Sequence, residues 1–155
     1  MQSGVVEGIY LAAATGARPE PVEEALAVPG RGLEGDRYFK QEGTYYAEGK
    51  TGQDLTLIEA EAIERLEREN GIELAPGDAR RNVVTRGLQL NDLVGRRFTV
   101  GGIECVGRRL CDPCEYLESV TKPGVLKGLA RRGGLRADIL SGGTISVGAA
   151  VKELG

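Results

Sequence analysis

The sequence predicts a mainly β protein, a closed β-barrel with a few short covering helices. Its 155 residues include 24 glycines but only two phenylalanines and no tryptophan, which is typical of many tight turns between short strands. Many short strand candidates alternate with glycine turns, and few stretches are typical of helices. At this length, with 41% hydrophobic residues, we expect one domain over residues 1–155 with a sizeable core.

The first half of the chain contains the clearest helix. The elements expected here are strands over 5–14, 24–28 and 54–58, followed by a helix over 59–70. Within the helix, Ala62, Ile63 and Leu66 form one apolar face, and Gly71 provides the stop. We therefore expect a helix that covers a sheet and turns its glutamates to solvent.

The second half alternates short strands with glycine turns. The expected elements are strands over 81–85, 98–100, 103–106, 135–140 and 144–151, and a helix over 125–132. Gly101-Gly102 joins two of these strands as a hairpin, because two glycines suit a tight two-residue turn. The Ser141-Gly142-Gly143 turn predicts a last hairpin between 135–140 and 144–151.

The net charge of −3 hides an uneven distribution. Residues 1–79 carry 7 basic and 16 acidic side chains, and residues 80–136 carry 12 basic and 5 acidic ones. The basic excess either solvates the surface or forms a pocket for an anionic ligand. Because the whole chain is acidic and has no aromatic platform among its arginines, we expect no nucleic-acid partner.

Cysteine content and hydropathy bear on location. Three cysteines, an odd number with two closely spaced, favour a reducing compartment over a disulfide framework. No apolar run approaches the length of a membrane span, and residues 1–4 do not begin a secretory signal. We expect a cytoplasmic protein without a membrane partner.

The most informative motif is the Cys-x-x-Cys pair. Asp112 suits a helix N-cap, Pro113 the first helical position and Glu115 the third. Cys114 then lies in the first turn, where free backbone N–H groups and nearby arginines stabilise a thiolate. This placement favours Cys114 over Cys111 as the reactive sulfur.

Such a pair has four interpretations. A structural zinc site needs about four ligands, and the chain has no histidine and only Cys105 besides the pair. Thioredoxin-like redox chemistry normally follows a first strand in a βαβ unit, whereas this pair comes late in the chain. Two buried, inert thiols remain an alternative. The favoured interpretation is a reactive or metal-coordinating thiolate, with Cys105 packed in a strand.

Three further motifs contain residues that recognise anions or amide edges. They are Gly35-Asp36-Arg37, Arg80-Arg81-Asn82 and Gly133-Gly134-Leu135-Arg136-Ala137. Arginine binds phosphate and carboxylate with two N–H groups, and paired glycines can expose backbone N–H groups beside a cation. Structural ion pairs and a simple turn are the alternatives.

The order of the motifs along the chain is more specific than any one of them. It reads GLEGDR at 32–37, LTLIEAE at 55–61, RRNVVTRG at 80–87, LVGRRFTVG at 93–101, CDPC at 111–114, RGGLRA at 132–137 and GGTISVG at 142–148. This series resembles the MOSC domain, the C-terminal module of molybdenum cofactor sulfurases that also occurs as small stand-alone proteins. The resemblance covers residues 5–152.

The resemblance implies a MOSC-type β-barrel with a pocket for a molybdenum–pterin cofactor. It implies that Cys114 carries sulfur or ligates molybdenum, and that Arg37, Arg81, Asn82 and Arg136 hold the pterin and its phosphate. Cys111 lies just outside the family pattern, and we include it beside Cys114 as a candidate catalytic thiol whose role is unassigned.

Three functions follow from the resemblance. The first is a cofactor-binding protein that handles sulfur or molybdenum through Cys114, as a sulfur carrier in cofactor sulfuration. The second is a molybdenum-dependent reductase of N-hydroxylated compounds, and the third is a non-enzymatic module that delivers the cofactor. The implied partners are the anionic pterin cofactor and a molybdoenzyme, a cysteine desulfurase or an electron-transfer protein.

The chain departs from the family in two respects. Stand-alone reductases often have a histidine soon after Gly-Asp-Arg, where this chain has Tyr38-Phe39-Lys40. A proton donor would then be Tyr38, Lys40, a carboxylate or water. The chain has no room for a desulfurase domain, so we expect no pyridoxal phosphate.

Overall fold

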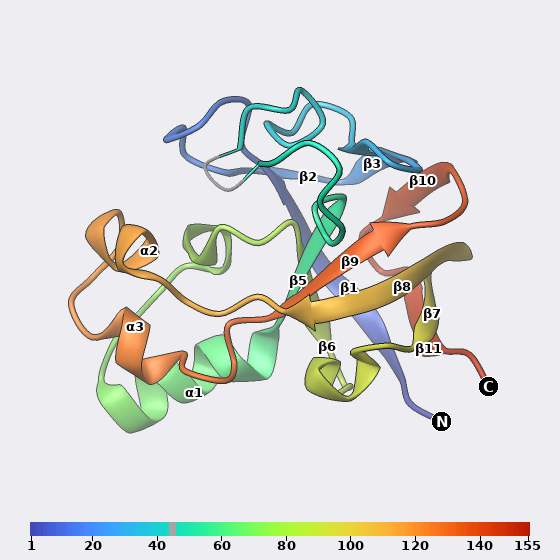
Figure 1. The fold of residues 1–155 in the computed structure, drawn as a ribbon. Helices are drawn as coiled ribbons and strands as arrows, with labels where there is room; N and C mark the ends of the chain where they lie inside the picture. The colour runs from blue at the N-terminus through green and yellow to red at the C-terminus, as the bar shows by residue number, and fades with distance from the viewer. Residues whose placement is uncertain (44–45) are drawn as a thin grey trace.

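The strands of the protein close into a β-barrel that carries short helices on its outside (Figure 1). The computed structural model describes residues 1–43 and 46–155. The strands are β1 (Ser3–Leu11), β2 (Glu20–Val22), β3 (Glu24–Val28), β4 (Gly32–Leu33), β5 (Leu55–Glu59), β6 (Val83–Arg86), β7 (Arg97–Val100), β8 (Ile103–Leu110), β9 (Leu135–Ile139), β10 (Gly143–Ser146) and β11 (Ala150–Glu153). The helices are α1 (Ala60–Asn70), α2 (Glu115–Ser119) and α3 (Val125–Gly128), with 3₁₀ helices η1 (Pro76–Ala79) and η2 (Leu90–Leu93).

Seven strands form the barrel in the order β11-β7-β8-β9-β5-β6-β1, and β1 pairs back onto β11 to close it. At this seam Ser3 lies opposite Lys152 and Val5 opposite Ala150. Strand β2 extends the sheet beside β1, and β10, β3 and β4 form a second small sheet. The barrel pairs are antiparallel except β5 and β6, which are parallel and joined through α1. The predicted closed, mainly β architecture is confirmed.

Alternation along β5 separates two apolar clusters. Leu55 and Leu57 are fully buried inside the barrel, together with Phe98 of β7. Ile58 points outward and packs with Leu66 of α1 in a second cluster under the helices. Helix α1 therefore covers the barrel with the face predicted from its sequence, and it ends at Gly71, whose φ of 67° is left-handed.

The hairpin at Gly101-Gly102 is also confirmed. Strands β7 and β8 pair with Val100 opposite Ile103, which leaves the two glycines as the whole turn. Their φ angles of 58° and 83° are both positive, as a type I′ turn requires. Two adjacent residues without a Cβ make this turn almost free of steric cost.

The predicted last hairpin is wrong. The stretch 144–151 is broken at Gly148, whose φ is 90°, and it supplies parts of two strands rather than one. Strand β10 pairs with β3, and β11 pairs with β7 and β1, so neither pairs with β9. A turn motif reports local chain reversal, whereas these partners are chosen by closure of the whole barrel.

No helix among the described residues has the length and apolar character needed to cross a bilayer.

A half-buried carboxylate ties the loop before β5 to the barrel. Asp54 accepts hydrogen bonds from the backbone N–H groups of Gly30 (3.1 Å) and Ile139 (3.0 Å). Burial raises the pKa of Asp54 above its ordinary 3.8, the two hydrogen bonds oppose this, and the charge of Asp138 adds to it. The folded protein therefore holds the Asp54 proton more tightly than the unfolded chain does.

This shift predicts a specific pH dependence. Between pH 3.8 and the raised native pKa, the native state binds more protons, so the Asp54 contribution to stability falls as pH rises. Asp54→Asn keeps a carbonyl acceptor but cannot ionise. We expect the free energy of unfolding of the variant, relative to wild type, to increase with pH through this window and then level off. Urea denaturation at a series of pH values measures this, and a difference that stays flat or decreases contradicts it.

Candidate functional site

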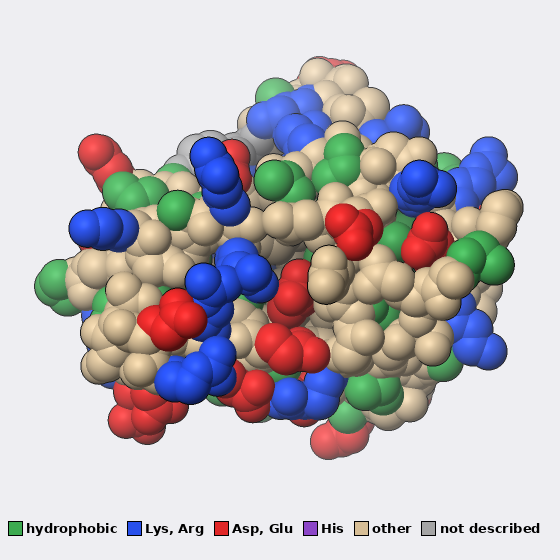
Figure 2. All heavy atoms as spheres, turned by 90° about the horizontal axis from the view of Figure 1, so that it is seen from below, with side chains coloured by type: hydrophobic (Ala, Val, Ile, Leu, Met, Phe, Trp, Pro, Cys, Tyr) green, Lys and Arg blue, Asp and Glu red, His purple; other side chains and the backbone are tan. Residues whose placement is uncertain are grey.

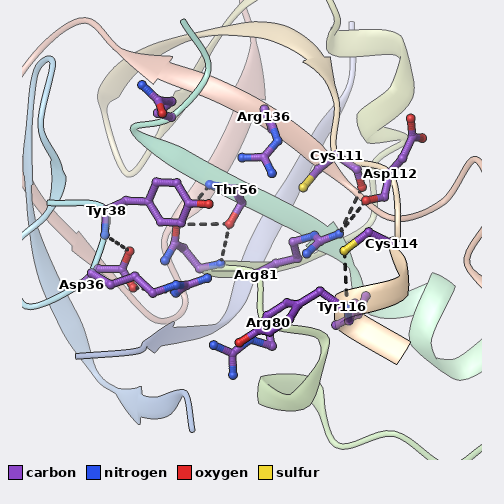
Figure 3. A pocket seen from close by; sticks show the side chains of 14 residues that line it. Asp36, Tyr38, Thr56, Arg80, Arg81, Cys111, Asp112, Cys114, Tyr116 and Arg136 are labelled. Carbon is purple, nitrogen blue, oxygen red and sulfur yellow. Dashed lines mark hydrogen bonds and ion pairs between the residues drawn. The ribbon is translucent and has the colours of Figure 1, made fainter. Parts of the chain in front are cut away.

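One cavity on the outside of the barrel gathers every site residue predicted from the sequence (Figure 3). Its empty volume is about 550 Å³ out to the open mouth. Thr56 of β5 lies at its floor, on the opposite face of the strand from the buried Leu55 and Leu57. The lining residues are Asp36, Arg37, Tyr38, Gln53, Thr56, Arg80, Arg81, Asn82, Cys111, Asp112, Cys114, Tyr116, Leu117 and Arg136.

Arg81 holds the cysteine loop in place. Its Nε donates to the carbonyl of Gly133 at 2.8 Å, and its Nη2 donates to the carbonyls of Cys111 (3.2 Å) and Asp112 (3.4 Å). A further N–H reaches the carbonyl of Ala79 at 3.4 Å. Arg81 is 8% exposed and, among the described residues, has no carboxylate at ion-pair distance. It thus offers the cavity its positive charge and one remaining N–H group.

Asn82 is used in a similar way. Its Oδ1 accepts from the N–H and the hydroxyl of Thr56, both at 3.1 Å, and its Nδ2 donates to the carbonyl of Tyr10 at 3.4 Å. These side-chain bonds extend the parallel β5–β6 pairing by one position, next to its first residue pair. One amide N–H of Asn82 remains for a ligand, so the ligand roles inferred for Arg81 and Asn82 stay predictions.

The glycine pair before β9 packs closely against the cysteine loop. A Cβ on Gly133 would lie 2.3 Å from the Cys111 carbonyl oxygen and 2.7 Å from the Pro113 ring. Gly134 accepts a 2.7 Å hydrogen bond from the Cys111 N–H. The main chain here anchors the cysteine loop through its carbonyls, at a position where the sequence left open either a nest of N–H groups or a simple turn.

Cys114 lies at a different helix position from the predicted one. Helix α2 begins at Glu115, so Cys114 itself is the N-cap, and its Sγ accepts the N–H of Leu117 at 3.4 Å. The predicted N-cap at Asp112 is wrong, because Arg81 binds the carbonyls of residues 111 and 112 and holds them outside the helix. The sulfur is thus fixed at the start of the helix by a backbone N–H.

The other two cysteines are less accessible. Cys111 is 1% exposed, although it reaches the cavity wall, and Cys105 lies inside the barrel. Burial, with smaller contributions from nearby acidic groups, raises the pKa of Cys105 to about 12. Cys114 is partly exposed and lies at the cavity. The structure thus orders the three sulfurs by access, with Cys114 first.

This order predicts thiol reactivity in the native protein. With a neutral alkylating reagent we expect one fast thiol, which Cys114→Ser removes and Cys105→Ala leaves unchanged. Cys111 and Cys105 should react at least about tenfold more slowly, at the rate of local opening. Mass spectrometry of partly labelled protein measures this. Equal labelling of Cys114 and Cys105 before unfolding contradicts it.

Arg37 and Arg136, the two other predicted arginines, differ in how the protein holds their side chains. Arg37 contacts Asp36 at 3.4 Å, and its side chain is only 11% exposed. Asp36 in turn accepts the N–H groups of Ala12 (3.1 Å) and Tyr38 (3.2 Å), which fixes the loop. Arg136 lines the cavity without a hydrogen bond or ion pair to any described residue, so it is available to an anion. The structure also adds Arg80, a member of the Arg-Arg-Asn motif that nothing in the sequence distinguished.

Ion pairs on the surface neutralise part of the basic excess seen in the sequence. Arg86 binds Glu7 and Glu64, each at 2.7 Å, and Arg108 binds Asp138 at 2.7 Å. On the face seen in Figure 2, basic and acidic side chains are interspersed rather than gathered in one patch. The cavity is different, because four arginines line it against two aspartates, a net charge of +2.

The cavity can hold a metal only together with another group. Across residues 1–43 and 46–155, no three His, Cys, Asp or Glu side chains lie together as a metal site would require. Cys114 could therefore be one ligand, and the remaining ligands would arrive with the cofactor. Two buried donors, Arg37 Nε and Arg80 Nη2, find no acceptor within the described protein. This donor set fits an anionic organic cofactor.

The protein is thus a closed β-barrel whose outer face carries a pocket that contains cysteines and is lined by arginines. These features define its class. The MOSC domain model matches residues 44–152, and the chain belongs to this family. Molybdenum cofactor binding is associated with the family. The match begins after Arg37, so the Asp36–Arg37 wall of the pocket lies outside it. The sequence matches no curated protein.

Solved structures show the same fold. YuaD from Bacillus subtilis has a TM-score of 0.81 at 18% identity, covering 97% of this chain and 95% of that one. YiiM from Geobacillus stearothermophilus has a TM-score of 0.75 at 18% identity, covering 98% and 75%. YiiM from Escherichia coli has a TM-score of 0.68 at 19% identity, covering 100% and 70%.

Proposed function

We propose that the protein binds a molybdenum–pterin cofactor in this cavity, with the Cys114 thiolate at the molybdenum end. The observation that carries the proposal is the combination of a partly exposed cysteine with a cavity whose arginines and aspartates sum to a charge of +2. Arg136 has no side-chain partner among residues 1–43 and 46–155, and Arg37 and Arg80 each have a donor without an acceptor there. These three arginines bind the anionic part of the cofactor. Arg81 and Asn82 shape the wall between these arginines and Cys114.

The bound cofactor would supply two-electron redox chemistry or an acceptor for sulfur, neither of which the side chains provide alone. The chain contributes a fixed sulfur, because Cys114 is held at the start of α2 by the N–H of Leu117. Sulfur handling through Cys114, as a carrier in cofactor sulfuration, is the function we favour. A single domain, a cytoplasmic location, and a molybdoenzyme or cysteine desulfurase partner belong to the same proposal.

The test is to purify the protein from a host that makes the cofactor and to assay molybdenum and pterin. We expect wild type and Cys105→Ala to contain both, and Cys114→Ala to lose molybdenum at least about tenfold, the scale for a lost metal-site interaction. Pterin should remain in Cys114→Ala, because the arginines are intact. Unchanged molybdenum in Cys114→Ala, or no cofactor in any form, contradicts the proposal.

One observation favours a second candidate, a molybdenum-dependent reductase of N-hydroxylated compounds. Tyr38 lines the cavity, and its hydroxyl points into it (Figure 3), which provides a proton donor where the chain has no histidine. Reduction with an external electron donor that Tyr38→Phe slows, with cofactor content unchanged, would favour this function. A loaded protein without turnover that activates an apo-molybdoenzyme would instead indicate sulfur or cofactor delivery.

A further inference from the structure

A second cavity opens on the side of the barrel that carries α1, and it shares no lining residue with the cavity of Cys114. Its empty volume is about 1340 Å³ out to the open mouth. The start of α1, the segment 87–91 and the loop 130–132 after α3 form its walls. Figure 2 faces this side of the molecule, where basic and acidic side chains lie next to one another. The proposed function makes no use of this cavity.

Two glutamates at the start of α1 are held in the same way. Glu59 Oε2 accepts the N–H of Leu90 at 3.1 Å, and Glu61 Oε2 accepts the N–H of Gly87 at 2.8 Å. Each bond fixes a carboxylate through one oxygen, and neither Oε1 atom accepts a hydrogen bond from a described residue. Oε1 of Glu61 is buried, so the lack of a donor is costly there. Both carboxylates line the cavity and leave two acceptor oxygens for a cation.

The position of these glutamates on the helix explains their charge but not their unused oxygens. Acidic side chains near a helix N-terminus are stabilised by the helix dipole. Glu59 is the N-cap of α1, yet its side chain makes no capping hydrogen bond. Burial raises the pKa of Glu59 above its ordinary 4.5, the bond from Leu90 opposes this, and the charge of Glu61 adds to it. A cation beside the two carboxylates would relieve their repulsion.

Two arginines of the same cavity are not paired with these glutamates. Arg131 and Arg132 belong to the loop after α3, and neither side chain makes a hydrogen bond or an ion pair with any residue that the structure describes. The charge of Arg132 lowers the pKa of Glu59, but the two groups lie beyond ion-pair distance. Arg65, the third arginine of the lining, is bound to Glu69 at 2.7 Å. The cavity therefore presents two unpaired positive groups and two negative ones, which sum to zero.

The backbone of Arg131 is strained where it borders the cavity. Its φ of 64° is left-handed, a conformation that residues other than glycine adopt rarely. Its carbonyl accepts a hydrogen bond from Nδ2 of Asn91 at 2.8 Å, which holds the loop against the segment 87–91. Such strain is often found at functional sites, and here an arginine in place of glycine keeps a guanidinium at the cavity.

We propose that this cavity binds a zwitterion, a small molecule with one ammonium and one carboxylate group, the chemistry of a free amino acid. The ammonium, with its three N–H donors, binds Glu59 and Glu61, and the carboxylate binds the guanidinium groups of Arg131 and Arg132. A ligand with a single charge would satisfy one half of the cavity and leave the other uncompensated. This site is independent of the cofactor proposed for the Cys114 cavity.

The test measures binding of three zwitterions, free glycine, β-alanine and 4-aminobutyrate, to the full chain by calorimetry. The three differ in the separation of their charges, and methylammonium and acetate serve as the two halves. We expect at least one zwitterion to bind at least about tenfold more tightly than either half, because only the zwitterion engages both pairs of side chains. A half that binds as tightly as every zwitterion overturns the assignment, and so does the absence of binding by all three.

Two variants locate the binding. Glu61→Gln keeps an oxygen for the N–H of Gly87 but loses the charge, and Arg131→Gly removes the guanidinium while it relieves the left-handed strain. We expect each to weaken zwitterion binding at least about tenfold, the scale of one charged hydrogen bond, and urea denaturation checks that both are folded. Glu67→Gln is the matched control, because Glu67 is an exposed glutamate of the same helix outside this cavity. Binding by Glu61→Gln and Arg131→Gly within about twofold of wild type overturns the site.

Discussion

Arg81→Met is expected to lower the free energy of unfolding by about 3 kcal/mol and to make the Cys111 thiol accessible. Methionine has a similar length but no donors, so the carbonyls of Cys111 and Gly133 lose their partner inside the protein. Each buried, unsatisfied carbonyl costs about 1–3 kcal/mol. Loss of an unpaired buried charge offsets part of this cost, since that charge is itself unfavourable.

The measurement combines urea denaturation with thiol labelling in a Cys114→Ser background, which isolates Cys111. Arg97→Met is the matched control, because Arg97 is 66% exposed in an ion pair with Glu104, and such pairs contribute at most about 1 kcal/mol. Arg81→Lys should be intermediate, since one ammonium cannot reach all these carbonyls. A stability loss no larger than that of Arg97→Met, with Cys111 still protected, would show that Arg81 does not hold the loop.

Gly134→Ala is expected to cost at least about 3 kcal/mol, from the sum of backbone strain and a steric clash. Gly134 has φ of 117°, and an added Cβ would lie 2.1 Å from the carbonyl oxygen of Leu57. That oxygen belongs to β5, so the clash pushes β9 from the strand that forms the cavity floor. We expect the Cys111 N–H to lose its bond to Gly134 as well.

Gly102→Ala separates the two causes. Gly102 also has a positive φ, 83°, but on this hairpin turn nothing lies within 4 Å of the position that an added Cβ would take. Strain alone should cost about 1–2 kcal/mol there. Thermal or urea unfolding of both variants gives the difference due to the clash. Equal losses for Gly134→Ala and Gly102→Ala would mean that β9 shifts at no cost.

The elements that were predicted correctly depend on local signals. Helix α1 has an apolar stripe and a glycine stop within one stretch, and the Gly101-Gly102 turn lies between two strands that pair with each other. The predicted last hairpin failed because its turn signal was equally local but its strands pair elsewhere. Strand β10 meets β3, more than a hundred residues away, and no nearby residue encodes that choice.

The site shows the same division. The three arginines and Asn82 were found because their types and order resemble a family pattern, and the Cys-x-x-Cys pair because of its spacing and its place at a predicted helix start. All six line one cavity. Arg80 was not distinguished, since its left-handed backbone and orphaned donor exist only in the folded chain. The start of α2 was misplaced because Arg81, thirty residues earlier, binds the carbonyls of Cys111 and Asp112.

The pairing of β1 with β11 has a mechanical consequence. The two strands are antiparallel, with Ser3 opposite Lys152, and both chain ends leave from the same end of the seam (Figure 1). A force that pulls the ends apart therefore loads the hydrogen bonds between these strands one after another, like a zipper, instead of all together in shear. The barrel should open at low force along this direction even where its chemical stability is high.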